Sequence, residues 1–134
     1  MGKGENIWHQ IHVHDLSDLY LAIGEAAAAG GGKATWNNEG YYFAENGPFA
    51  WGDIEKAVSK TAFDKGLIPS PEPDILDGTQ TAAEFAPGPG LWGLNSRGRA
   101  IRGRKLFGWD PHRPGALVLI PDIVDVEARA LSLI

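Results

Sequence analysis

The feature that most limits the fold of this chain is the number and placement of its glycines and prolines. The sequence contains 18 glycines and 9 prolines among 134 residues, so the fold should be rich in turns. Pro69, Pro71 and Pro73 exclude regular helix from one segment, and Pro87 and Pro89 interrupt the chain again. We therefore expect the regular elements to lie on either side of these breaks.

The composition is otherwise that of a globular protein. A hydrophobic fraction of 43% and an aromatic fraction of 10% suffice for a core. No internal repeat or linker divides the chain, so we expect one domain over residues 1–134. The absence of cysteine excludes a disulfide framework, a thiolate metal site and cysteine nucleophilic catalysis.

The charge balance indicates which classes of binding partner are unfavourable. Twelve basic and 17 acidic residues give a net charge of −5, which argues against binding to nucleic acid or to an anionic membrane. No apolar run approaches the roughly 20 residues of a membrane span. Residues 1–5 lack the apolar core of a signal peptide. These features predict a cytoplasmic protein.

Periodicity predicts alternating elements in the first half. Residues 7–14 alternate as in a strand, and Asp15 stands where the N-cap of the next helix is expected. That helix should end at glycines 30–32, and the aromatic residues 41–43 favour a second strand. A helix from Trp51 should end at Gly66. Strand, helix, strand in this order predicts a βαβ unit with parallel strands.

The second half is expected to be helical. We predict helices at residues 79–85, at residues 96–107, and from Pro121 onward, because proline suits a first helical turn. The expected fold class is α/β and mostly helical, with a short two-stranded parallel βαβ unit and three or four further helices.

Several short motifs, in order, resemble one enzyme family. They are residues 4–8 with 15–20, Gly40–Gly47 with Trp51, Asn95-Ser96-Arg97, Gly108-Trp109-Asp110-Pro111, and residues 120–124 with Glu127-Ala128. Together they resemble the C-terminal, substrate-binding part of extended short-chain dehydrogenases, which include the NAD-dependent epimerase/dehydratase-like proteins. This resemblance implies a substrate lobe as the fold and a small molecule as the ligand.

The nucleotide-binding half of that family is not recognisable here. Its members carry a glycine-rich turn after the first strand and a catalytic Tyr-x-x-x-Lys, but Gly24, Glu45 and Asn46 follow the three tyrosines at that spacing. NAD(P) is therefore implied only for a complete family member, and we expect this chain alone to bind no cofactor. Gly88–Gly93 fits Gly-x-Gly-x-x-Gly, but no strand precedes it, so we interpret it as a chance match.

Candidate ligand-binding residues come from three places. Tyr42, Glu45 and Asn46 follow the expected second strand, where open α/β sheets place ligands, and Glu45 is a candidate general acid or base. Trp92 lies in the Pro/Gly segment before Asn95. The family motif and the basic run 97–105 then suggest that an arginine holds an anionic group of the substrate. The candidate substrate-binding residues are Tyr42, Asn46, Trp92, Asn95, Arg97 and Arg102.

Two other patterns receive structural interpretations. His9, His12 and His14 lie near one strand end, but no further ligand set accompanies them, so we predict no metal site. Within the basic run, Arg104 is expected on a solvated helix face.

Three functions remain open. The first is the substrate-binding lobe of an extended short-chain dehydrogenase-like protein without redox activity of its own. The second is a cofactor-independent isomerase or cyclase that reuses the same cleft, and the third is a non-catalytic partner of a complete relative. We also expect a homodimer, because a face formed by Ile7, Ile11, Val13, Leu16 and Leu19 would lack its cover.

Overall fold

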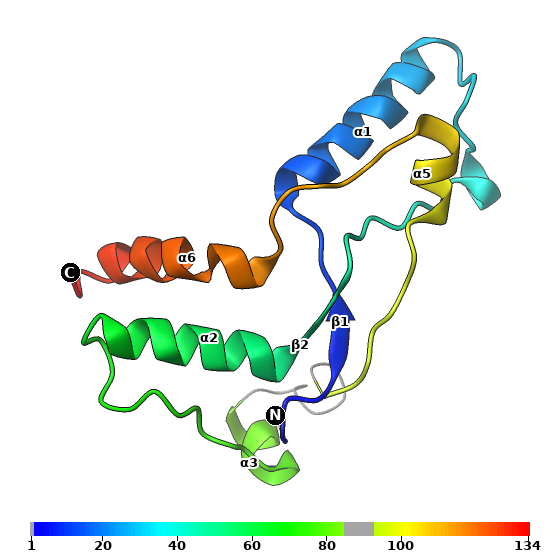
Figure 1. Cartoon of the computed structure of the whole chain (residues 1–134). Coiled ribbons are helices and arrows are strands. Elements are labelled where there is room, and N and C mark those ends of the chain that lie inside the picture. The colour runs from blue at the N-terminus through cyan, green and yellow to red at the C-terminus, as the bar shows by residue number, and fades with distance from the viewer. Residues whose placement is uncertain (1, 85–92) are drawn as a thin grey trace. The chain divides into compact units, whose positions relative to one another are not determined.

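The computed structural model describes residues 2–84 and 93–134. The fold is α/β and mostly helical, as expected. In chain order its elements are β1 (Ile7–His9), α1 (Val13–Ala28), the 3-10 helix η1 (Asn37–Glu39), β2 (Pro48–Ala50), α2 (Trp51–Asp64), α3 (Gly78–Glu84), α5 (Ile101–Phe107) and α6 (Ala116–Ala130) (Figure 1). In the part of the chain so described, no helix is long and apolar enough to span a bilayer.

The two strands run antiparallel, so the predicted parallel βαβ unit is wrong. β1 and β2 form a two-stranded sheet, and their flanking residues pair in opposite order. The Gln10 amide donates to the Gly47 carbonyl, whereas the Trp51 amide donates to the Asn6 carbonyl. The aromatic residues 41–43 are not a strand. The long connection between α1 and β2 lets the chain enter β2 from either end, so the crossover rule for compact βαβ units does not apply.

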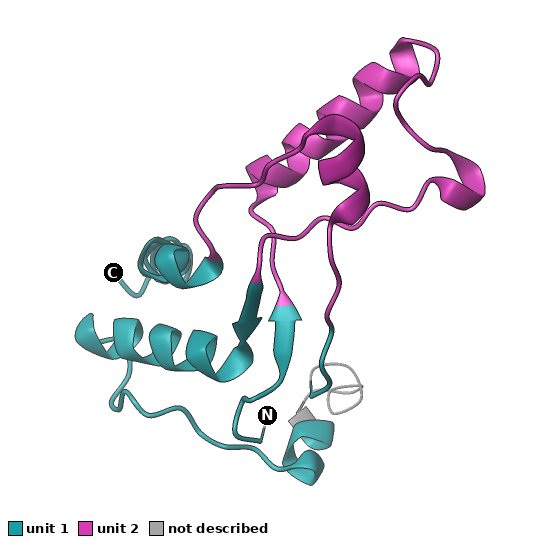
Figure 2. Cartoon of the chain, turned by 45° about the vertical axis from the view of Figure 1, so that its right-hand side comes forward, with its two compact units in different colours: residues 1–8, 48–96, 116–134 teal, residues 9–47, 97–115 magenta. Residues whose placement is uncertain are grey.

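The chain divides into two compact units, each made of separate chain segments. Unit 1 contains residues 1–8, 48–96 and 116–134, and unit 2 contains residues 9–47 and 97–115 (Figure 2). The α2 and α6 helices belong to unit 1, while α1 and α5 belong to unit 2. Each unit has its own buried apolar residues.

In unit 1, α2 and α6 pack against each other along their length (Figure 1). Ile120, Val124 and Ala128 recur at helical spacing on α6 and are its buried residues. Near the start of α2, the Gly52 amide donates to the Gly4 carbonyl at 2.8 Å. Gly4 has a φ of +67°, and a Cβ there would lie 2.4 Å from the Gly52 Cα, so only glycine fits this approach.

In unit 2, a small core joins α1 to α5 and the segment that follows α5. Leu19, Ala100 and Trp109 are its buried residues. Gly103 lets α5 approach closely, because a Cβ there would lie 3.0 Å from the Leu19 Cδ1. This packing holds α5 beside α1.

The ends of α1 agree only in part with the sequence prediction. The helix ends at Ala28, and Gly30 and Gly31 follow with φ values of +84° and +92°, which confirms the predicted glycine stop. The N-cap is His12, whose Nδ1 accepts from the His14 amide at 3.1 Å. Asp15 is therefore not the cap; it lies in the first turn and is buried.

Two helix starts differ from the prediction. α5 begins at Ile101 and not at residue 96, because Ser96 forms a parallel bridge with Trp8 and residues 97–100 form no regular element. α6 begins at Ala116, so Pro121 lies inside the helix and not in its first turn. The apolar residues before Pro121, including the buried Ile120, favour helix strongly enough to outweigh the lost hydrogen bond.

The apolar face expected to mediate dimerisation is not continuous. Leu19 is buried in the core of unit 2, and Ile11 packs against that core, whereas Val13 is exposed. Homodimer formation stays a prediction.

Candidate functional site

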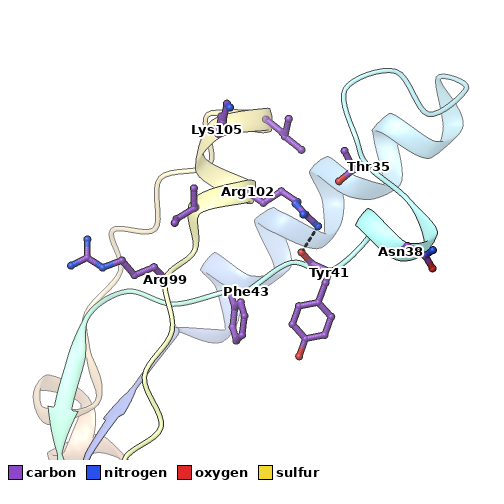
Figure 3. Close-up of a pocket in the computed structure, with 9 residues that line it drawn as sticks. Thr35, Asn38, Tyr41, Phe43, Arg99, Arg102 and Lys105 are labelled. Carbon is purple, nitrogen blue, oxygen red and sulfur yellow. Dashed lines mark hydrogen bonds between the residues drawn. The ribbon is translucent and has the colours of Figure 1, made fainter.

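Two pockets of unit 2 meet beside the segment that joins α1 to β2. The first, which we call the cationic pocket, has a volume of about 460 Å³ and is lined by Thr35, Asn38, Tyr41, Phe43, Arg99, Ile101, Arg102, Lys105 and Leu106 (Figure 3). One wall is α5 with the residues just before it, and the other is the segment 35–43. No carboxylate is present among these lining residues.

Arg102 fixes the two walls of the cationic pocket to each other. It extends from α5 toward the opposite segment (Figure 3). One guanidinium nitrogen donates to the Glu39 and Tyr41 carbonyls, the latter at 2.8 Å, and the other bonds the Glu39 carboxylate at 3.1 Å. The guanidinium also lies 5.8 Å from the centre of the Tyr42 ring. Arg102 thus positions the pocket wall, and Glu39 balances its charge.

Arg99 and Lys105 are the other cationic residues that line the pocket, and in Figure 3 the Arg99 guanidinium points away from Tyr41 and Phe43, toward solvent. Arg99 precedes α5 and Lys105 lies in its last turn, so the two cations lie toward opposite ends of this wall (Figure 3). Both residues are exposed, and neither forms an ion pair with any carboxylate in residues 2–84 or 93–134. An anion at the rim of the pocket would therefore meet charge that is not already neutralised.

Tyr41 and Phe43 present their rings to solvent. They are 72% and 52% exposed, and the rings meet edge to face with centroids 5.3 Å apart. Phe43 is supported by Gly98, where a Cβ would lie 3.2 Å from the ring. Such exposed aromatic area next to unpaired cations is typical of a ligand-binding surface.

The second pocket, which we call the apolar pocket, shares the lining residue Tyr41 with the first. Its volume is about 300 Å³, and it is lined by Leu16, Leu19, Tyr20, Ile23, Gly40, Tyr41, Tyr42 and Ala44. Aliphatic and aromatic side chains dominate it, and none of the described lining residues is charged. Tyr41 lines both pockets.

Glu45 has a structural role in the observed geometry. Its Oε1 accepts from the Ala100 amide at 3.0 Å, and its Oε2 accepts from the Gly47 amide at 2.9 Å. Burial opposes ionisation, but these amide hydrogen bonds, with the charges of His9 and Arg104, hold the pKa of Glu45 below its usual range. At neutral pH this carboxylate is an ionised acceptor and a poor general acid.

A buried carboxylate at the start of α1 stabilises the opposite side of unit 2. Asp15 is 1% exposed; its Oδ1 accepts from the Arg113 guanidinium at 2.7 Å and its Oδ2 from the Arg113 amide at 3.0 Å. Burial opposes ionisation, but the hydrogen bonds from Arg113 and His112 lower the pKa of Asp15. The Trp109 indole donates to the Asp15 carbonyl at 2.8 Å. These contacts fix residues 109–113 to α1.

The structure brings together only some of the sequence-predicted site residues. Arg102 lines the cationic pocket and Tyr42 lines the apolar one. The Tyr42 hydroxyl is bonded to Thr35, and its ring stacks on Phe107. Asn46 and Arg97 belong to unit 2 but line neither pocket.

Among the described candidates, Asn95 and Arg104 do not line this site. Asn95 belongs to unit 1, where its Oδ1 accepts from the Ile7 amide at 2.7 Å. Trp92, and all but the last glycine of the Gly88–Gly93 motif, lie outside the described residues. Arg104 is not simply solvated: it donates to the Glu45 carbonyl at 3.2 Å and lies 5.6 Å from the centre of the Trp109 ring.

The histidines have structural contacts. The His9 Nδ1 accepts from the Gly98 amide at 2.9 Å, and His12 caps α1 and stacks on His14. Among the residues the structure describes, no group of three or more histidine, aspartate or glutamate side chains is arranged to hold a metal.

Sequence reasoning missed Tyr41, Phe43, Arg99 and Lys105 as site residues. Tyr41 and Phe43 alternate like a strand, and alternation alone does not reveal that neither is covered. Arg99 and Lys105 belong to a basic run that the sequence places within one helix at residues 96–107, whereas residues 97–100 are not helical.

Comparison with known proteins identifies a longer relative. The chain is 30% identical to "Oxidase ucsJ" from Acremonium sp. over an alignment that covers 99% of this chain and 40% of the relative. The chain therefore spans less than half the length of this relative. No protein-family model and no solved structure matches the chain.

Proposed function

We propose that this chain is the substrate-binding part of an oxidoreductase, and that the two pockets of unit 2 receive the substrate. The observation that carries the proposal is the site itself: unpaired cations and exposed aromatic rings next to an apolar recess, in a chain that aligns along 99% of its length with part of an oxidase. The expected resemblance to the substrate lobe of extended short-chain dehydrogenases agrees with this role, and the cytoplasmic location expected from the sequence is part of the proposal.

The connection from β1 to α1 does not fit a nicotinamide dinucleotide. In dinucleotide-binding folds the pyrophosphate lies at a helix N-terminus after a glycine-rich turn. Here the connection from β1 to α1 is Gln10-Ile11-His12, without glycine, and the first turn of α1 contains the Asp15 carboxylate. The Asp15 carboxylate is already bonded to the Arg113 guanidinium and amide, so residue 113 and not a pyrophosphate occupies this helix start. We therefore propose that this chain binds substrate, and that the start of α1 holds no dinucleotide.

The cofactor-independent isomerase or cyclase is less well supported. It requires an acid or base in the cleft, and Glu45 was its candidate. Both oxygens of that carboxylate accept backbone amides, and its pKa is lowered. Glu45 therefore stabilises the fold rather than transferring protons.

Calorimetric titration of the purified chain with NAD⁺ and NADP⁺ tests the proposal. We expect no saturable heat up to about 1 mM of either cofactor, a range that detects dissociation constants weaker than those typical of such enzymes. Saturable binding in the low micromolar range would show that the chain holds its own dinucleotide site and would overturn the assignment.

A further inference from the structure

The arrangement of the two pockets around Tyr41 indicates which kind of molecule fits both. We infer that the substrate is an amphipathic organic acid, with a carboxylate or enolate in the cationic pocket and an apolar body in the apolar pocket. The inference rests on the proposed function where it calls the bound molecule a substrate. The kind of molecule that binds is argued from the residues of unit 2 alone.

The apolar pocket favours a hydrocarbon body over a polar one. Leu16, Leu19 and Ile23 contribute aliphatic wall from α1, and the rings of Tyr20 and Tyr41 lie at its edge. A volume of about 300 Å³ lies at the small end of the range for ligand pockets. An aromatic ring or a short branched chain fits such a space, and its transfer from water contributes about 25 cal/mol per Å² buried.

The cationic pocket favours a negative charge on the other end of the same molecule. Arg102 is occupied by two carbonyls and the Glu39 carboxylate, so it contributes little net charge. Arg99 and Lys105 have no carboxylate partner in the described chain, although the whole protein carries a net charge of −5. A local excess of positive charge on an acidic protein selects small anions, because the negative charges elsewhere repel a polyanion.

Tyr41 connects the apolar pocket and the cationic pocket. Its side chain lines both pockets, and 72% of it is exposed, so its position is not explained by packing of the core. The Arg102 hydrogen bond to the Tyr41 carbonyl fixes the backbone that carries this ring. A molecule that contacts Tyr41 and extends into both pockets meets apolar wall in one and cationic residues in the other, so we expect it to be apolar at one end and anionic at the other.

The first experiment compares three small probes by calorimetry or NMR titration: 2-naphthoate, its neutral analogue 2-naphthalenemethanol, and acetate. We expect naphthoate to bind about tenfold more tightly than either of the others, because only it satisfies both pockets. Equal affinity for the acid and the alcohol would show that charge is not recognised. Equal affinity for naphthoate and acetate would show that the apolar pocket is not used. Either result, or no binding of naphthoate, overturns the inference.

Variants then place the probe in the structure. Changing both Arg99 and Lys105 to glutamine should reduce naphthoate binding to the level of the alcohol, and Tyr41→Ala should weaken both probes. All three side chains are exposed, so folding should be retained, as circular dichroism would verify. Lys56→Gln and Phe63→Ala on α2 are the matched controls and should leave affinity unchanged. Controls that weaken binding as much as the pocket variants would contradict the assignment.

The outcome is separable from that of the cofactor titration. Selective naphthoate binding together with tight dinucleotide binding would leave this inference intact and overturn the proposed function. Loss of probe selectivity without cofactor binding would overturn this inference and leave the proposed function intact.

Discussion

Unit 1 and unit 2 are held together by different interactions. The buried residues of α6 in unit 1 are all apolar. In the same unit the backbone of Gly4 lies directly against the backbone of Gly52. Unit 2 has an apolar core of Leu19, Ala100 and Trp109 and depends in addition on charged side chains that bond to backbone groups: Asp15, Glu45 and Arg102. A segment fixed by a few directional bonds leaves aromatic rings and cations uncovered. Unit 2 can therefore present a binding surface that a fully packed core would bury.

The largest expected effect is in unit 1. Gly4→Ala would place a methyl group 2.4 Å from the Gly52 Cα at a φ of +67°, so we expect a loss of about 3 kcal/mol or more in stability. Amide hydrogen exchange measured by mass spectrometry should show lost protection in α2 and α6, and little change in α1. Gly2→Ala is the control, because Gly2 also has a positive φ but no atom near its Cβ. Equal effects of the two changes would show that the close approach is unimportant.

The matching test in unit 2 is Asp15→Ala. It removes the acceptor of the Arg113 guanidinium and amide, so we expect a loss of about 1–3 kcal/mol. Protection should fall in α1 and in residues 109–113. Asp18→Ala removes a bond from the same guanidinium at an exposed site and should cost less. If Asp15→Ala destabilised α2 more than α1, the division into two differently stabilised units would be wrong.

Lowering the pH should destabilise unit 2 more than unit 1. Asp15 and Glu45 have lowered pKa values in the folded protein, so their contribution is fully present above their unfolded pKa values of about 4. That contribution disappears as the pH falls through the lower folded values. In unit 1 the described residues include one carboxylate with a lowered pKa, Asp125, which pairs with Lys65, against two in unit 2. The urea midpoint for loss of hydrogen-exchange protection should therefore fall between about pH 5 and pH 2 more steeply in α1 peptides than in α2 peptides. Parallel curves for both units would contradict this expectation.

The smallest expected effect is the difference in naphthoate affinity between variants of two nearby arginines, Arg97 and Arg99. The sequence points to Arg97 as the residue that holds the substrate's anionic group, whereas the structure places Arg99 in the pocket. Arg99→Gln should weaken naphthoate binding about three- to tenfold, and Arg97→Gln should change it less than twofold. Titration calorimetry on both variants decides between them. The opposite order would restore the sequence-based assignment.

These results show which features the sequence could predict. The helices α1 and α2 were predictable because their apolar periodicity is clear, and the stops at Gly30 and Gly108 because left-handed backbone favours glycine there. The strand direction was not predictable, since local pattern does not determine how a long connection returns. Glu45 and Tyr42 were recognised as important, but their role depends on distant partners, Ala100 and Phe107, that no local pattern indicates.

The central claim is that the pockets of unit 2 bind the ligand. It is tested most directly by recording ¹H–¹⁵N correlation spectra of the ¹⁵N-labelled chain during titration with 2-naphthoate. The account predicts saturable shift changes confined to residues 16–23, 35–44 and 99–106, with the signals of α2 and α6 unchanged. Shift changes centred on unit 1, or no saturable change at millimolar naphthoate, would contradict it.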